Sequence, residues 1–215
     1  MLADDHPSTL LGNRLALAGT NTISVVGMVH NSTELVALLE TQPCDVLVTD
    51  FFMPGGDYGD GIAMLEYVQR HYPKVKIAVA TMLEGPLVLR PLIRIGVHCI
   101  VSKTDEASHL IPAVHVASAG GSYFSPRLVE MARMLEQQMR EGRAPEELTM
   151  RELEVIRYYV SGMTWRDIAR VLKRSKQTIS TQKVSAMKKL GVERDADLLK
   201  YALEVGLAGA AYGRK

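Results

Sequence analysis

The sequence predicts a doubly wound, five-stranded parallel α/β domain followed by an all-α domain of four helices. Short apolar or β-branched runs alternate with helical patterns five times before Gly120-Gly121, which is typical of a parallel sheet built from βαβ units. Beyond these glycines only helical patterns remain. The charge changes at the same place, because residues 1–121 hold 7 Lys/Arg against 12 Asp/Glu and residues 122–215 hold 18 against 12. Two domains with different partners would explain both changes.

The composition is that of an ordinary globular protein, with 47% hydrophobic and 23% charged residues over 215 positions. No apolar run is long enough to span a bilayer, and the first residues lack a basic region followed by an apolar core. We therefore expect a cytoplasmic protein with no membrane partner. Cys44 and Cys99 have no metal-ligand spacing, so we expect two reduced thiols.

The strands of the first half are short runs of apolar and β-branched residues bounded by turn residues. We expect them at Leu2–Ala3, Ile23–Val29, Asp45–Thr49, Val75–Ala80 and Val97–Val101. The helices between them are expected at Pro7–Gly19, Glu34–Glu40, Ile62–His71, Leu87–Ile95 and Asp105–Ala119. Pro7 suits the first turn of its helix, and Asn31 or Ser32 should cap the second. Pro91 should kink or shorten the fourth helix.

A linker at 122–147 is predicted to hold one amphipathic helix, which begins at Ser125-Pro126 and ends near Arg140. Four helices should follow, and the first three of them have cap residues. A capping box formed by Thr149 and Glu152 precedes the first of them, and Gly162 ends it. Thr164 and Ser175 should cap the second and third helices, and Gly191 should end the third. The fourth is expected at about Ala196–Val205.

A set of polar side chains falls at the carboxyl ends of the predicted strands, where open α/β sheets bind ligands. Its members are Asp4, Asp5, Asp50, Thr81 and Lys103. Three carboxylates brought together repel one another unless a divalent cation neutralises them, and hard oxygen ligands favour Mg²⁺. The backbone carbonyl of Phe52 is a plausible further ligand. With Thr81 and Lys103 as donors to phosphoryl oxygens, the set suits in-line phosphoryl transfer to the Asp50 carboxylate.

Residues 166–189 are strongly basic, with eight Lys/Arg against Asp167 alone. Two short capped helices separated by a tight turn predict a helix-turn-helix whose second helix enters a DNA major groove. Ile179, Ala186 and Leu190 share the inward face of that helix. The candidate DNA contacts are Lys176, Gln177, Thr178, Ser180, Thr181, Lys183, Val184 and Lys188. Gln177 and Thr181 should read base edges, whereas the lysines should contact phosphates.

Both halves resemble known families. The acidic pair, Asp50-x-x-Met53-Pro54, Thr81 and Lys103 resemble a response-regulator receiver domain, which implies a flavodoxin-like fold over residues 1–121. Leu148-Thr149-x-Arg151-Glu152, Ile168-Ala169 and Thr178-Ile179, followed by Gly191, look like a LuxR-type helix-turn-helix over residues 148–215. Together they resemble the NarL/FixJ class of response regulators.

That resemblance implies phosphorylation of Asp50 by a histidine kinase or a phosphotransfer protein. It also implies Mg²⁺ as cofactor, promoter DNA as target and a homodimer, with an auxiliary regulator in a heterodimer left open. The expected function is therefore a phosphorylation-controlled transcription factor, and not an enzyme.

Two alternatives remain. The receiver could serve only for dimerisation and accept no phosphate, which the short first strand favours and the full set of pocket residues opposes. The chain could instead be an aspartyl-phosphate phosphotransferase enzyme with Asp50 as nucleophile. Haloacid-dehalogenase-like enzymes need an acid/base carboxylate two residues after the nucleophile, and Phe52 stands at that position.

Overall fold

The computed structural model describes residues 1–141 and 148–204, and the chain divides into two compact units. One unit comprises Met1–Thr81 and Arg90–Met134, and the other comprises Met82–Leu89 and Leu135–Lys215. Residues 142–147 of the predicted linker and the predicted end of the last helix at Val205 lie outside the described residues.

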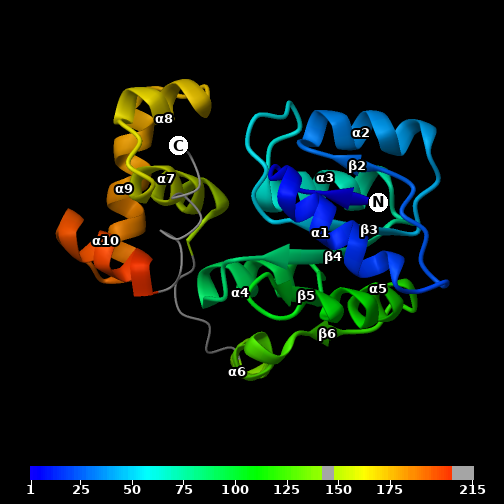
Figure 1. Cartoon of the computed structure of the whole chain (residues 1–215). Helices are drawn as coiled ribbons and strands as arrows, with labels where there is room; N and C mark the ends of the chain where they lie inside the picture. Colours follow the sequence, from blue (N-terminus) through cyan, green and yellow to red (C-terminus); the bar gives the residue numbers. More distant parts are fainter. Residues whose placement is uncertain (142–147, 205–215) are drawn as a thin grey trace. The chain divides into compact units, whose positions relative to one another are not determined.

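A parallel sheet forms the centre of the first unit, with strand order β2-β1-β3-β4-β5-β6 (Figure 1). The strands are β1 (Leu2–Ala3), β2 (Met28–Val29), β3 (Val46–Asp50), β4 (Lys76–Thr81), β5 (Cys99–Ser102) and β6 (Tyr123–Phe124). The order of the first five is that of a doubly wound sheet, which confirms the predicted fold class. All four residues of β5 are buried, as expected of a strand covered on both faces.

The sheet has six strands where the sequence predicted five. Tyr123 and Phe124, which we placed in the linker, pair in parallel with Cys99 and Ile100 of β5. Gly120 has a φ of 74°, so the chain reverses directly after the preceding helix. The Tyr123 amide then donates to the His98 carbonyl at 2.8 Å. Two aromatic residues, separated from Gly120-Gly121 only by Ser122, were the signal for this strand.

Five α-helices and one short 3₁₀ helix connect the strands of this unit. They are α1 (Pro7–Ala18), α2 (Ser32–Thr41), α3 (Gly61–His71), α4 (Pro86–Arg94), η1 (Ala107–His109) and α5 (Leu110–Ser118). Asn31 caps α2 by accepting from the Glu34 amide at 2.9 Å. α4 continues through Pro91 and ends at Arg94, one residue before the predicted end.

One face of the sheet carries a core built with α1 and α5. Leu10 and Leu17 of α1 and Leu110 of α5 pack in one buried cluster with the apolar side chains of β1, β3, β4 and β5. Alternate strand residues such as Val46 and Val48 point into this cluster, as the period of two requires. The core therefore fixes the face and register of the strands whose ends carry the polar set.

The second strand is shorter than predicted, with Met28–Val29 where we expected Ile23–Val29. β1 has only two residues, so it pairs with β2 only at Leu2↔Met28 and Ala3↔Val29. Among the described residues, no backbone group of Ile23–Val26 makes a hydrogen bond to a neighbouring strand. A cavity of about 140 Å³ lies where β1 would continue towards its start, lined by Met1, Ile23, Val25, Val26, Cys44 and Val46.

The second unit is helical, with α7 (Met150–Val160), α8 (Trp165–Val171), α9 (Lys176–Leu190) and α10 (Asp195–Glu204), while α6 (Pro126–Arg140) precedes them. The predicted caps are confirmed: Thr149 and Glu152 form the capping box, and Thr164 and Ser175 cap α8 and α9. Gly191 ends α9 in the left-handed conformation, with a φ of 67°. The core of the second unit contains a buried cluster of Val155, Ile168, Ala169 and Ile179. In the described parts of the chain, no helix is long and apolar enough to cross a membrane.

We predict that an apolar extension placed before Met1, such as Val-Ile-Val-Ile, stabilises the first unit. It would fill the cavity, pair with Ile23–Val26 and convert the buried Met1 ammonium, which donates to the Val46 carbonyl at 2.9 Å, into an amide. Melting temperature measured by circular dichroism should rise by several degrees, since 1 kcal/mol corresponds to roughly 2–8 °C in domains of this size. A Gly-Ser-Gly-Ser extension is the matched control. Equal melting temperatures for the two extensions would contradict the prediction.

Candidate functional site

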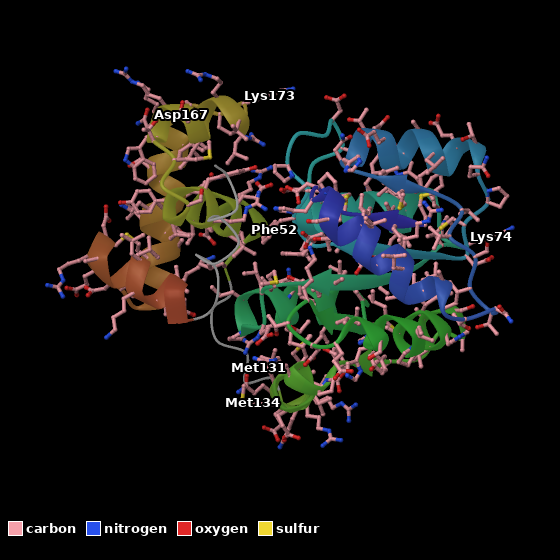
Figure 2. The ribbon with its side chains drawn as sticks, viewed as in Figure 1. Phe52, Lys74, Met131, Met134, Asp167 and Lys173 are labelled. Carbon is pink, nitrogen blue, oxygen red and sulfur yellow. The ribbon has the colours of Figure 1, made fainter. Side chains whose placement is uncertain are left out.

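The predicted polar set lies at one edge of the sheet. Asp50 ends β3 and Thr81 ends β4, while Asp4 and Asp5 follow β1 and Lys103 follows β5. Strands β3 and β4 pair with Asp50 opposite Ala80, which places Asp50 and Thr81 at neighbouring strand ends. Figure 2 labels Phe52 beyond β3 at this edge of the sheet and Lys74 before β4 at the opposite edge. The parallel topology therefore collects side chains that are up to about 100 residues apart in sequence.

Lys103 joins two of the carboxylates. Its Nζ lies 2.6 Å from Asp4 Oδ2 and 2.7 Å from Asp50 Oδ2. The other Asp50 oxygen accepts from the Phe51 amide at 2.6 Å, and the Lys103 amide donates to the Thr81 carbonyl at 2.9 Å. Asp4 is 1% exposed as a side chain and Asp50 is 13% exposed. These short contacts hold Asp50 in one orientation at the rim of the sheet.

Burial and charge set the protonation of these groups. Burial, opposed by the Lys103 ammonium and aided by the neighbouring Asp4 carboxylate, raises the pKa of Asp50 to about 6 in total. Burial alone would lower the pKa of Lys103, but the Asp50 and Asp4 carboxylates raise it. Lys103 therefore stays charged at neutral pH, whereas Asp50 ionises at some cost in stability.

The same edge offers ligands for a cation. Asp4, Asp5, His6 and Asp50 each have one ligand atom within 4.8 Å of the others. His6 Nδ1 lies 2.7 Å from Asp5 Oδ1 and 3.5 Å from Asp4 Oδ1. The three carboxylates fit a hard divalent cation, and Phe52, which follows β3 directly, can add its backbone carbonyl. His6 was not among the predicted site residues, although it directly follows the acidic pair.

The outward face of α9 carries most of the candidate DNA contacts. Its exposed members are Lys176, Gln177, Ser180, Thr181, Val184 and Lys188, and Val184 is 64% exposed. Ile179, Ala186 and Met187 face the core instead. Thr178 is half-buried, and its hydroxyl lies 2.8 Å from the Ser175 hydroxyl at the helix start. In Figure 2 Asp167 of α8 and Lys173 beyond its end lie on the surface of this unit.

Two of the candidates are engaged within the protein. The Thr181 hydroxyl donates to the Gln177 carbonyl at 3.0 Å, the back-bond that mid-helix threonines often make. Its oxygen can still accept a hydrogen bond, and the residue is exposed. Lys183, predicted to contact phosphate, forms an ion pair with Asp195 and is 12% exposed as a side chain. Its ammonium is therefore engaged by a neighbouring helix of the same unit, and its phosphate contact stays a prediction.

Comparison with known proteins agrees with both halves of this architecture. Residues 1–115 match the response regulator receiver domain, and residues 146–202 match the bacterial regulatory proteins of the luxR family. The transcriptional regulatory protein RcsB of Escherichia coli (strain K12) is 40% identical over 210 residues, which cover 98% of this chain and 96% of that protein. The chain belongs to the RcsB-like response regulators.

Solved structures of RcsB have the same fold. One, of the Salmonella typhimurium RcsB response regulator, described for its conformational dynamism in DNA interaction, has a TM-score of 0.79 at 36% identity and covers 95% of this chain and 96% of its own. Another is RcsB from Salmonella enterica serovar Typhimurium bound to promoter rprA in the presence of the phosphomimetic BeF3-. Its TM-score is 0.74 at 38% identity, covering 93% of this chain and 95% of its own.

This response regulator therefore has a receiver unit that carries the predicted polar set at the carboxyl edge of its sheet. The structure brings Asp4, Asp50 and Lys103 into direct contact, places Asp5 beside them and leaves Thr81 buried at the neighbouring strand end. Relatives such as RcsB are transcriptional regulatory proteins, and the second unit has the helix arrangement of a LuxR-type helix-turn-helix.

We expect Asp50→Asn to raise the free energy of unfolding of the metal-free protein at pH 7 by up to about 3 kcal/mol. The folded pKa of about 6 exceeds the ordinary value of 3.8, and each pKa unit corresponds to about 1.4 kcal/mol. Because the folded pKa is raised, the cost of the charged carboxylate is absent below about pH 4 and grows as the pH rises through 6. Asp50→Asn and the unchanged protein should therefore have equal free energies of unfolding near pH 3.5. The full difference between them should be present above pH 7.

Urea denaturation in EDTA at several pH values measures this difference. Asp45→Asn, an exposed residue just before β3, is the control and should change little across the range. A lower stability of Asp50→Asn at pH 7 would contradict the prediction.

Proposed function

We propose that Asp50 is the phosphoacceptor of this response regulator and that the outward face of α9 binds promoter DNA. The observation that carries the first part is the position of the Asp50 carboxylate, which Lys103 holds beside the acidic pair at the carboxyl edge of the sheet. The phosphoryl donor would be a histidine kinase or a phosphotransfer protein. We also propose the division into a receiver at 1–121, a linker at 122–147 and a DNA-binding domain at 148–215.

The transfer would proceed in line at phosphorus. An Asp50 Oδ attacks the phosphohistidine of the partner, a P–O bond forms, the P–N bond breaks and the imidazole leaves with its electron pair. Lys103 already contacts Asp50 Oδ2, and its ammonium can form an ion pair with an oxygen of the transferred phosphoryl group. The Thr81 hydroxyl can donate a hydrogen bond to another phosphoryl oxygen. Mg²⁺ held by Asp4, Asp5, Asp50 and the Phe52 carbonyl would neutralise charge on the phosphoryl group.

The DNA-binding part rests on the exposed polar side chains of α9 and on the relatives. Solved structures of RcsB include complexes with promoter DNA, and this chain has the same two units. Gln177 and Thr181 near the start of α9 would read base edges, while Lys176 and Lys188 would contact phosphates. We propose that the protein acts in the cytoplasm on promoter DNA as a homodimer, or as a heterodimer with an auxiliary regulator.

A second candidate is a DNA-binding regulator whose receiver accepts no phosphate. The two-residue β1 favours it, because β1 positions Asp4 and Asp5. The short Lys103 contacts oppose it, since they already hold Asp4 and Asp50 in place. An aspartyl-phosphate phosphotransferase is opposed by the buried Phe52, which stands where an acid/base carboxylate would be needed.

Labelling with acetyl phosphate separates the first two candidates. The full chain with Mg²⁺ should gain one phosphoryl group by mass spectrometry, Asp50→Asn should gain none, and EDTA should abolish labelling of the unchanged chain. Asp45→Asn should label normally. Absence of labelling in the unchanged chain, together with full DNA binding, would support the phosphate-independent candidate and refute ours.

Base reading and phosphate contact predict different effects of substitutions in α9. With a duplex of the rprA promoter as probe, Thr181→Ala should cost roughly 1–3 kcal/mol and should cost little on a random duplex of equal length. Lys188→Ala should weaken both and reduce the slope of log K against log salt by about one contact. Fluorescence anisotropy at several salt concentrations measures both quantities. Equal losses for Thr181→Ala on the two duplexes would remove Thr181 from the base-reading set and leave its back-bond to Gln177 as its role.

A further inference from the structure

One side chain from each of the four helices α7 to α10 meets in a single cluster. Tyr159 comes from α7, Trp165 from α8, Lys183 from α9 and Asp195 from α10. The Tyr159 and Trp165 rings stack with their centroids 4.5 Å apart and planes 15° apart. Lys183 Nζ lies 4.3 Å from the Tyr159 centroid and 4.8 Å from the Trp165 centroid. Polar contacts and ring packing thus join all four helices at one point.

Asp195 completes the cluster by accepting from two donors. The Tyr159 hydroxyl donates to Asp195 Oδ2 at 2.5 Å, and Lys183 Nζ donates to Asp195 Oδ1. These two donors lower the pKa of Asp195, while burial and the Asp195 carboxylate raise the pKa of Tyr159 to about 12. At neutral pH Asp195 is therefore a carboxylate anion and Tyr159 a neutral phenol, and both donors of the cluster make attractive contacts with that anion.

Lys183 makes its side-chain contacts inside the second unit. Its side chain is 12% exposed, and a cation held over aromatic rings is attracted more strongly when it is desolvated. Lys188, five residues later on the same helix, is exposed and makes no ion pair among the described residues. Two lysines of one helix therefore have different environments, although the sequence pattern gave them the same role.

We propose that Lys183 is a positioning residue, which fixes the orientation of α9 on the other three helices through the Tyr159, Trp165 and Asp195 cluster. The proposal rests on the proposed DNA-reading role of α9. A reading helix must be held to within a fraction of an ångström for hydrogen bonds to base edges to form, and its supporting side chains supply that precision. Ile179 anchors α9 in the core near its start, and Lys183, one turn later, is its polar anchor.

The test compares Lys183→Gln, Lys183→Arg and Lys188→Ala in the full chain, using the rprA duplex and the random duplex at several salt concentrations. Lys183→Gln should bind the rprA duplex about tenfold more weakly, the change that 1.4 kcal/mol makes. Its affinity for random DNA and its salt slope should stay near those of the unchanged chain. Lys183→Arg should restore binding, because arginine keeps the charge, stacks on aromatic rings and pairs with carboxylate.

Asp195→Asn provides a second test, since it removes the carboxylate that pairs with Lys183 and keeps the lysine itself. If Lys183 positions α9, the ratio of rprA to random affinity should fall in Asp195→Asn as well. The double variant with Lys183→Gln should then lose no more of that ratio than Lys183→Gln alone, because both changes disrupt one cluster. Circular dichroism at the binding temperature checks that each variant is folded.

Several outcomes would overturn the proposal. A salt slope reduced in Lys183→Gln as much as in Lys188→Ala would make Lys183 a phosphate contact. An unchanged affinity ratio in folded Lys183→Gln would leave the cluster with a role in stability only. If instead Thr181→Ala and Lys188→Ala are both without effect, the DNA-reading role of α9 fails, which is a separate result from failure of the Lys183 variants.

Discussion

The receiver edge depends on one ammonium group shared by two buried carboxylates. Lys103 follows β5, Asp50 ends β3 and Asp4 follows β1, so a single side chain reaches past β4 to join three strands. Without this cation, two carboxylates with little access to water would face each other. The arrangement keeps Lys103 charged and leaves the pKa of Asp50 high. A site in this state has a net affinity for further positive charge, which is the condition for binding a divalent cation and then a phosphoryl group.

The sequence predicted the residues of this edge because their positions follow from topology. Alternating strands and helices imply a parallel sheet, and a parallel sheet places every strand end on the same side, whatever the packing details. The caps Thr149, Thr164 and Ser175 were equally predictable, since each depends on residues three positions apart in the chain. The helix caps could therefore be predicted from local chemistry, and the positions of the polar set from the sheet topology.

The errors arose where a distant part of the chain decides the outcome. Ile23–Val26 has strand composition, but it pairs with no strand among the described residues because β1 has only two residues. Tyr123 and Phe124 become a strand because β5 has an open side. The partners of Lys183, a carboxylate twelve residues later and two rings from other helices, were likewise not visible in the spacing of the basic residues. Residue type and periodicity carry no information about such partners.

The two outermost strands of the sheet, β2 and β6, have only two residues each. An edge strand exposes unpaired amide and carbonyl groups, which invite a second chain to add itself, and a long apolar edge is a hazard for aggregation. β5, with four buried residues, would present such an edge if Tyr123 and Phe124 did not cover it. The start of the connection to the second unit therefore also covers the open side of β5 and leaves only the two residues of β6 at that side of the sheet.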